Sequence, residues 1–383
     1  MTEAVGGMWG KYLLLAAGAL TIFFAALYTL LRLGITKQFT RIMMISVIVI
    51  FPLETIIFFR QPALESLSMI AFRVACYLLA ILGFYFGRIS FRQSRVSECI
   101  YDFLIPLTVT LGSLLYFKSL ASVAHYARGR ITVGDDISSV GLSFSLCLLG
   151  VICFSQAVTR VRVAARVLNI FAAIAVLPPV IVSASRGGLA AYFLTSLLVL
   201  VVQVYSDRKN FRKLLVYALL GLVSVFVMSY VLAQNALIKE QFVNLVDRFL
   251  RVSDGDDQST NARSIIVSYY FEHFWDFVFL GFPGYAGPYP HNLLLDFFVR
   301  FGLYGLLLVV FIYLRSFLVI FRFKNVIREP VLVLISSVTI FSFLNAQMSM
   351  TAEFLRFYWF CLAYVTSHFL LKYRSPSVIS SDV

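Results

Sequence analysis

The sequence is poor in charged residues, and acidic residues are the scarcer kind. Only 13% of the 383 residues are charged, with 19 Asp and Glu against 32 Lys and Arg, whereas soluble globular proteins carry about 25% charged residues. The five cysteines include no CxxC pair, so neither a disulfide framework nor a thiolate metal site is indicated. These shortages exclude a soluble globule and a secreted disulfide scaffold.

The sequence is correspondingly rich in hydrophobic residues. They account for 60% of the chain, and the mean hydropathy is +0.88. A membrane-spanning helix needs about 20 consecutive apolar residues. Apolar runs lie near 12–31, 42–59, 69–87, 99–117, 138–157, 168–184, 187–205, 214–233, 291–320, 330–347 and 355–371. The sequence therefore predicts an all-α integral membrane protein, in which residues 1–383 form a single polytopic domain of about eleven (roughly ten to twelve) transmembrane helices.

The net charge of +13 would suit a nucleic-acid partner, but the positions of the basic residues favour membrane topology instead. Lys and Arg concentrate in the cytoplasmic loops of multi-spanning proteins. One set of alternate loops, which includes Arg160, Arg162 and Arg166 and the tail residues Lys372 and Arg374, is much richer in basic residues than the other. We expect this set to be cytoplasmic, with the N-terminus outside, the C-terminus inside and no nucleic-acid partner.

One predicted outer connection, residues 234–290 between the eighth and ninth spans, is unusually long, because loops in compact proteins usually have a few residues. Within it, 236–252 has apolar residues at helical spacing, 253–260 reads SDGDDQST, and 265–282 is apolar and aromatic. We expect two short helices that lie against the membrane surface and are joined by an exposed polar turn.

The first candidate for a functional site is the segment Ser185-Arg186-Gly187-Gly188, at the predicted outer junction of two spans. Glycines let a phosphate approach the backbone, a helix start supplies free N–H groups, and Arg186 offers a two-pronged donor. The segment could therefore hold a pyrophosphate. The alternative is a basic residue that caps a tight turn at the level of the lipid headgroups.

The long loop supplies the second candidate, because outer loops should be poor in arginine. Arg248 and Arg251 lie on one helical face, and Arg263 follows the polar turn. Three arginines in one outer loop indicate an anionic partner, such as a pyrophosphate lipid. The alternative is that the three arginines pair with neighbouring aspartates, which applies more to Arg248 and Arg251 than to Arg263.

The third candidate is Tyr289-Pro290-His291-Asn292 at the outer end of the ninth predicted span, followed by Gly302 and Gly305. A lone histidine is more often structural than catalytic, and helix glycines usually serve packing. Two glycines at these offsets after a histidine would seldom occur by chance, because glycine fills only 21 of the 383 positions.

Ionisable residues also occur inside predicted spans, where they usually face a cavity or one another. Asp102, Asp296 and Arg300 are examples. Asp296 and Arg300 are four positions apart, so we expect a local ion pair between them.

At these motifs the sequence resembles the O-antigen polymerase and O-antigen ligase family of bacterial surface-polysaccharide assembly. The resemblance covers roughly residues 170–315, and the early spans carry no matching motif. It rests on Ser185-Arg186-Gly187, the long loop with Arg263, and His291-Asn292 followed by Gly302 and Gly305. It implies a membrane-embedded glycosyltransferase of GT-C-like architecture in the bacterial inner membrane. Its donor and acceptor would be undecaprenyl-pyrophosphate-linked oligosaccharides at the periplasmic face.

The resemblance also implies roles for individual residues. Arg186 and Arg263 would hold the lipid pyrophosphate, and His291 would lie at the reaction centre, so these three are the expected catalytic residues. The residues expected to bind pyrophosphate or glycan are Arg186, Gly187, Arg248, Arg251, Arg263, Tyr289 and Asn292. Arginine keeps its charge at every relevant pH and can replace a divalent ion. We therefore expect no metal or other cofactor, and interpret the acidic segment 254–257 as an exposed turn.

Three functions remain open from the sequence. We favour a polymerase that joins one lipid-linked repeat unit to another, because the outer loop is shorter than expected for an enzyme that binds lipid A core. The second is an O-antigen ligase, which transfers the glycan to lipid A core. The third is a flippase, which predicts an internal repeat and charges spread through the spans; the sequence has no such repeat. A chain-length regulator protein is a further candidate partner.

Overall fold

The computed structural model describes only part of the chain. The described residues are 67–87, 100–122, 126–127, 130–131, 139–159, 162–183, 185–206, 258–282, 290–326, 329–348 and 356–372, with scattered positions between 230 and 251. Nearly all of them are helical, so the predicted all-α class is confirmed for this part of the chain. The predicted spans near 12–31 and 42–59, and almost all of the one near 214–233, lie outside the described residues.

The helices coincide with the predicted apolar runs from residue 69 onward, wherever the structure describes those runs. They are α3 (Leu67–Phe86), the π-helix η1 (Ile100–Leu104), α5 (Ile105–Ser122), α6 (Ser139–Thr159), α7 (Val163–Ala175), α8 (Leu177–Val182), α9 (Arg186–Ser206), α12 (Gln258–Glu272), α13 (Phe274–Phe277), α14 (Leu293–Val326), α15 (Pro330–Ala346) and α16 (Arg356–Lys372). Two short strands, β1 (Tyr126–Ala127) and β2 (Arg130–Ile131), pair antiparallel.

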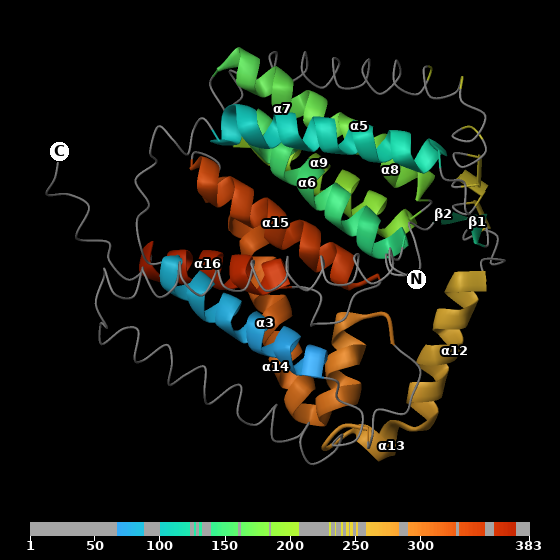
Figure 1. The fold of residues 1–383 in the computed structure, drawn as a ribbon. Coiled ribbons are helices and arrows are strands. Elements are labelled where there is room, and N and C mark those ends of the chain that lie inside the picture. The colour runs from blue at the N-terminus through green and yellow to red at the C-terminus, as the bar shows by residue number, and fades with distance from the viewer. Residues whose placement is uncertain are drawn as a thin grey trace, which may run out of the picture.

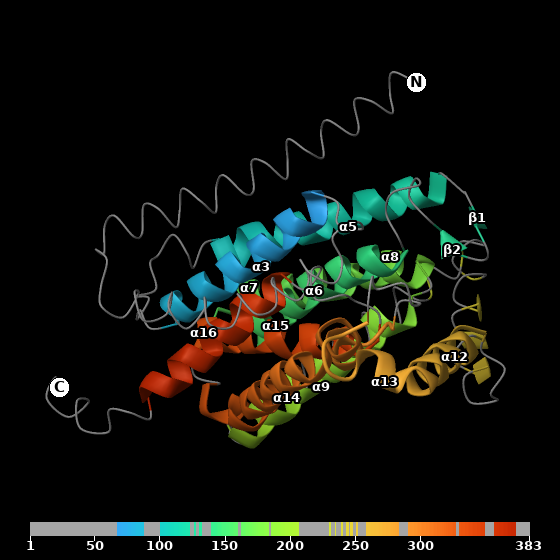
Figure 2. The same ribbon diagram turned by 90° about the horizontal axis from the view of Figure 1, so that it is seen from below.

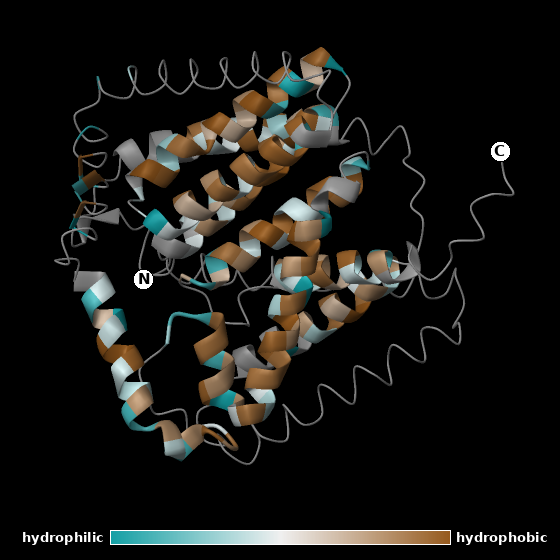
Figure 3. Ribbon diagram, turned by 180° about the vertical axis from the view of Figure 1, so that it is seen from behind, coloured by the Kyte–Doolittle hydropathy of each residue, from teal (hydrophilic) through white to brown (hydrophobic). Residues whose placement is uncertain are grey.

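Three helical segments in the described part of the chain are long and apolar enough to cross a membrane. They are Val163–Ile181, Arg186–Val204 and Leu293–Arg322. Apolar residues predominate along the bundle helices (Figure 3), and large apolar side chains such as Leu194, Leu307 and Leu314 are exposed. A helix that is apolar all round is typical of a membrane environment. The helices thus support a membrane protein, and the total of about eleven spans stays a prediction.

Helix α15 lies at the centre of the bundle (Figures 1 and 2). It packs against α6, α9, α14 and α16, and most of its residues are buried. Two of its buried hydroxyls bond within the helix, Ser337 to the Val333 carbonyl and Thr339 to the Ile335 carbonyl. Because polar groups in apolar surroundings must find partners, these bonds let polar side chains occupy the core.

Helices α3 and α16 approach each other closely through two glycines. A Cβ added at Gly83 would lie 2.1 Å from the Phe360 carbonyl oxygen, and one at Gly87 would lie 2.2 Å from the Tyr364 carbonyl oxygen. Small residues at this four-residue spacing let helix backbones pack directly in membranes.

Helix α14 reverses direction at Gly302, where φ is 58° and ψ is −142°. A Cβ added at Gly305 would lie 2.1 Å from the carbonyl oxygen of Phe297, although residues so separated are about 12 Å apart along a straight helix. The first arm, 293–301, therefore packs against the second arm, 303–326. The predicted apolar run 291–320 coincides with the long apolar helix Leu293–Arg322, but this helix is broken at Gly302, because glycine can adopt the positive φ that ends the first arm.

The helices of the long loop also begin and break at unexpected positions. Residues 258–260 were predicted in the polar turn, but they form the start of α12, where polar side chains are well accommodated. The predicted helical segment 265–282 is interrupted at His273, which separates α12 from α13 and has φ −100° and ψ 21°. Most of the predicted helix at 236–252 lies outside the described residues.

Three aromatic residues spaced by four form an exposed strip along α12, α13 and the turn that follows. Phe271 is 74% exposed, Trp275 is 78% exposed and Phe279 is 67% exposed. The strip ends beside the α14 reversal, since a Cβ added at Gly302 would lie 2.4 Å from the Phe279 carbonyl oxygen. Aromatic residues, tryptophan above all, favour the membrane–water interface. We therefore expect the strip to contact lipid.

Replacing Gly302 by Ala should lower the thermal stability of the detergent-solubilised protein. Alanine at positive φ costs about 1–2 kcal/mol, and its methyl group would clash with the Phe279 carbonyl. Gly112→Ala is the matched control, because a Cβ there meets nothing within 4 Å. Equal unfolding temperatures for the two variants, measured by intrinsic fluorescence, would contradict the assigned role of the reversal.

The fluorescence of Trp275 should be quenched by brominated lipids, because its side chain should contact lipid and be shielded from water. The chain has three tryptophans, so Trp9→Phe and Trp359→Phe together leave Trp275 as the sole reporter. In nanodiscs that hold one copy, phospholipids brominated near the headgroup should quench its fluorescence, and iodide should not. Strong iodide quenching without any effect of bromolipid would show that the strip faces water.

Candidate functional site

The start of α14 holds His291 in an uncommon backbone conformation. Asn292 caps the helix, since its Oδ1 accepts the backbone N–H groups of Leu294 at 2.9 Å and Leu295 at 3.2 Å, as Asn commonly does at helix starts. The residue before the cap, His291, has φ 53°. Non-glycine residues seldom adopt positive φ, at a cost of about 1–3 kcal/mol. The surrounding structure must therefore stabilise this turn.

Gln347, just after α15, provides part of that stabilisation. The Asn292 Nδ2 lies 3.4 Å from both the backbone oxygen and the Oε1 of Gln347. The Tyr313 hydroxyl, on the second arm of α14, donates to the same Oε1, and Gln347 Nε2 donates to the Phe343 carbonyl at 2.9 Å. Neither Gln347 nor Tyr313 was a candidate from the sequence, because neither is charged or part of a recognised spacing.

Arg263 and His291 are brought close enough to interact electrostatically. Both side chains are half-buried. Burial lowers the pKa of His291 below its ordinary value of 6.5, and the positive charge of Arg263 lowers it further. At neutral pH the imidazole is therefore uncharged and able to accept a proton. We call Arg263, His291, Asn292, Tyr313 and Gln347 the His291 cluster.

An aromatic cluster places Arg263 by docking α12 and α13 on the first arm of α14. Tyr270, Phe277 and Val299 are fully buried together, and the Phe282 N–H donates to the Val299 carbonyl at 2.7 Å. Aromatic contacts of this kind combine large apolar area with preferred geometry. Because α12 is anchored at its Tyr270 end, the position of Arg263 on the same helix is restricted.

The predicted ion pair between Asp296 and Arg300 is confirmed. Arg300 Nε lies 2.9 Å from Asp296 Oδ1, and the two side chains are 12% and 0% exposed. Buried charges are tolerated when they are paired. Burial raises the pKa of Tyr270 on α12 to about 12, with smaller contributions from Tyr269 and from the charge of Asp296, so the ion pair is near enough to α12 to act on it electrostatically. The pair thus supports the junction between α12 and α14.

The segment Arg186-Gly187-Gly188 begins α9, as predicted, and Arg186 is half-buried. Its two glycines differ in how much space the neighbouring helices leave for a side chain. A Cβ at Gly188 would lie 2.4 Å from the Ser143 hydroxyl of α6, so a larger residue there would have to displace this side chain. A Cβ at Gly187 would make only ordinary contacts of 3.4 Å with Met348. Packing therefore does not explain Gly187, whose backbone N–H belongs to the first turn and has no helical acceptor.

Three segments far apart in sequence meet around the end of α15. Gly187, in the first turn of α9, packs against Met348. The preceding residue, Gln347, contacts Asn292 at the start of α14, and His291 interacts with Arg263 of α12. The structure thus links the Arg186 and His291 motifs through contacts around Gln347 and Met348, and places Arg263 near enough to act on His291 electrostatically.

The remaining predicted site residues are exposed, take part in helix capping or lie outside the described residues. Arg251 is exposed. Arg248, Tyr289 and the acidic segment 254–257 lie outside the described residues. The carboxamide of Asn292 is engaged in helix capping and in contacts with Gln347, which gives it a role in local structure. Within the described ranges, no group of three or more His, Cys, Asp or Glu side chains could hold a metal ion.

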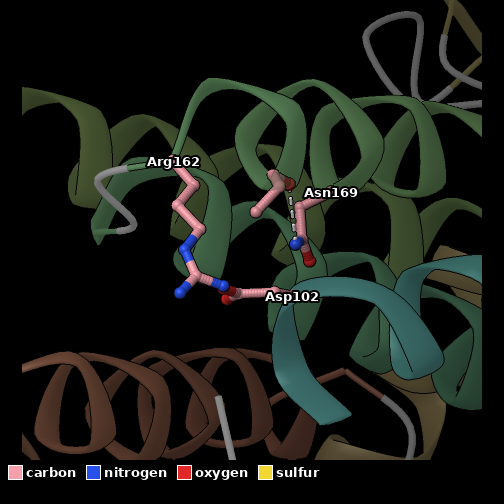
Figure 4. A network of polar contacts seen from close by, with 4 residues as sticks. Asp102, Arg162 and Asn169 are labelled. Carbon is pink, nitrogen blue, oxygen red and sulfur yellow. Dashed lines mark hydrogen bonds and ion pairs between the residues drawn. The ribbon is translucent and has the colours of Figure 1, made fainter. Parts of the chain in front are cut away.

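A second polar group lies at the opposite end of the α7–α8 segment, about 30 Å from the α9 start along a helix of that length. Figure 4 shows Arg162 reaching toward the buried Asp102 of η1, with Nη1 3.9 Å from Oδ2. Nearby, Asn169 Nδ2 donates to the Ala165 carbonyl at 2.9 Å. Asp102 thus faces a charged partner, although this partner precedes α7 and lies in a predicted basic loop instead of a span. Because Arg162 is 65% exposed and exposed pairs contribute little, we assign this group a minor structural role.

The chain matches no protein-family model, and a search of curated proteins finds no match. A functional assignment therefore rests on the residues themselves.

Removing the charge of Arg263 should raise the pKa of His291 toward its ordinary value, because one of the two causes of its depression is gone. The variant Arg263→Met keeps much of the side-chain length. NMR titration of isotope-labelled histidine in nanodiscs, with His291→Gln for assignment, measures the change. Lys239→Ala, which removes an exposed cation from the same loop, should leave the titration unchanged. An unaltered pKa in Arg263→Met would show that the two groups do not interact.

Proposed function

We propose that this chain is a metal-independent, membrane-embedded glycosyltransferase of the O-antigen polymerase type. It transfers an undecaprenyl-pyrophosphate-linked glycan onto the non-reducing-end sugar of another lipid-linked repeat unit, at the periplasmic face of the bacterial inner membrane. The observation that supports this most strongly is the interaction of a neutral histidine, His291, with the cationic Arg263. A proton acceptor beside a fixed positive charge suits the displacement of a pyrophosphate by a hydroxyl group.

In this reaction the acceptor hydroxyl attacks the anomeric carbon of the donor sugar. A new bond forms between that oxygen and the anomeric carbon, while the bond from the carbon to the pyrophosphate oxygen breaks. The electron pair leaves with undecaprenyl pyrophosphate, and His291 takes the hydroxyl proton. Arg186 and Arg263 neutralise the charge that develops on the leaving group.

The position of Arg263 also links donor binding to the strength of the base. Without donor, burial and, in addition, the charge of Arg263 lower the pKa of His291, so the uncharged imidazole can accept a proton. A pyrophosphate bound beside Arg263 would oppose the field of the guanidinium and favour the protonated imidazole. His291 would therefore become a stronger base when the donor is in place.

The helix arrangement suits a lipid-linked substrate at one membrane face. The start of α9 supplies N–H groups and Arg186, while its flanks expose apolar side chains such as Leu194 and Leu197 that suit a polyprenyl chain. Arg162 precedes α7 and thus lies a full α7–α8 length from the α9 start. Arg322, which lies over the Phe369 ring at 5.7 Å, marks the far end of α14. These arginines fit the cytoplasmic side of the positive-inside rule.

Purified protein in nanodiscs should produce a ladder of lengthened glycans from lipid-linked repeat units alone, as separated by gel electrophoresis. Product that forms only when lipid A core is added would assign the chain as an O-antigen ligase, which uses the same donor chemistry. Absence of product with either acceptor would contradict both.

Single replacement of Arg186, Arg263 or His291 by Ala should lower the transfer rate about 100-fold or more, the usual effect of losing a charge-stabilising or proton-accepting group. Lys239→Ala should retain the rate. Near-normal transfer by all three site variants would remove the proposed site.

A further inference from the structure

We infer that Gln347, together with Tyr313, is a positioning residue that orients His291 for proton transfer, a role that rests on the proposed function. It acts through Asn292, whose carboxamide both caps α14 and contacts Gln347. Since His291 directly precedes that cap, any movement of Asn292 moves the imidazole.

The orientation of the Gln347 amide is itself fixed. Its Nε2 donates to the Phe343 carbonyl at 2.9 Å, so its Oε1 is directed toward the donors of Tyr313 and Asn292. A glutamine is suited to this position because it offers a donor and an acceptor on one side chain. A carboxylate would lose the donor, and an aliphatic side chain would lose both groups.

The contact from Tyr313 depends on the reversal of α14. Along a straight helix, Tyr313 would lie about 30 Å from Asn292, yet both reach the same Gln347 side chain. Gln347 therefore ties the two arms of α14 to the end of α15, a helix that is buried along most of its length. A mobile imidazole would lower the rate of transfer, because positioning of the reacting groups contributes strongly to catalysis.

The same end of α15 also touches the segment that would hold the donor. Met348 contacts Gly187 in the first turn of α9. Gln347 and Met348 thus set the base and the α9 start relative to each other. This placement distinguishes Gln347 from Thr339, a buried polar residue of the same helix whose hydroxyl bonds locally to the Ile335 carbonyl at 2.8 Å.

The kinetic test compares Gln347→Met and Tyr313→Phe with the control Thr339→Val. Either site variant should lower kcat about 10- to 100-fold, while KM for the donor stays within about twofold, because the donor-binding arginines are intact. The double variant should lose little more than Gln347→Met alone, since both changes break one network. A rise in KM with unchanged kcat, or fully multiplicative losses, would overturn the positioning role.

A second measurement is independent of transfer activity. In Gln347→Met, NMR titration of labelled histidine should show the pKa of His291 rising toward its ordinary value, because a released imidazole moves toward solvent and away from Arg263. Thr339→Val should show no change. If wild-type protein transfers no glycan, the proposed function fails, yet the titration still tests the positioning. Loss of thermal stability in Gln347→Met with unchanged titration and kcat would mean a purely structural role and would overturn the inference.

Discussion

Gly302 adopts φ 58° and ψ −142°, and the geometry of the His291 cluster follows from the chain reversal at that residue. The reversal brings Tyr313 back to the level of Asn292, so that both can contact Gln347. It also forms the surface on which the Phe279 turn packs, and through that turn α13 and α12 are held against the first arm. One backbone conformation therefore supports both the Gln347 contact with Asn292 and the docking of α12, which carries Arg263.

The charges around this hairpin divide into two kinds. Asp296 and Arg300 are buried and neutralise each other at 2.9 Å, as an apolar environment requires, and they support the junction with α12. Arg263 instead lies near an imidazole whose pKa is lowered by burial and, in addition, by the positive charge of the arginine. The proposed function uses this cation, beside an uncharged base, to bind an anionic ligand.

Much of the helical architecture was predictable from the sequence, because a bilayer requires apolar runs of about 20 residues. The pair of Asp296 and Arg300 was also predictable, since residues four apart meet on a helix. The reversal at Gly302 was not, because hydropathy records which residues are apolar and contains no information on the direction of the chain. Arg263 and His291 were expected together only from the family resemblance.

Gln347 and Tyr313 illustrate why the site was only partly predictable. Each is an uncharged polar residue within an apolar run, and such residues most often bond locally, as Thr339 does. Their contact joins positions 34 residues apart and exists only because α14 folds back. A long-range contact of this kind leaves no periodic signal in a single sequence, so only the structure identifies it.

The proposed function requires that Arg186 and Arg263, from different helices, hold one pyrophosphate beside His291. Binding of undecaprenyl pyrophosphate to the wild-type protein, Arg186→Ala, Arg263→Ala and the double variant tests it most directly. Each single variant should bind more weakly, and the double variant should deviate from additivity by about 0.5 kcal/mol or more, because groups that share a partner are coupled. Unchanged affinity in either single variant, or strictly additive losses, would contradict a shared site.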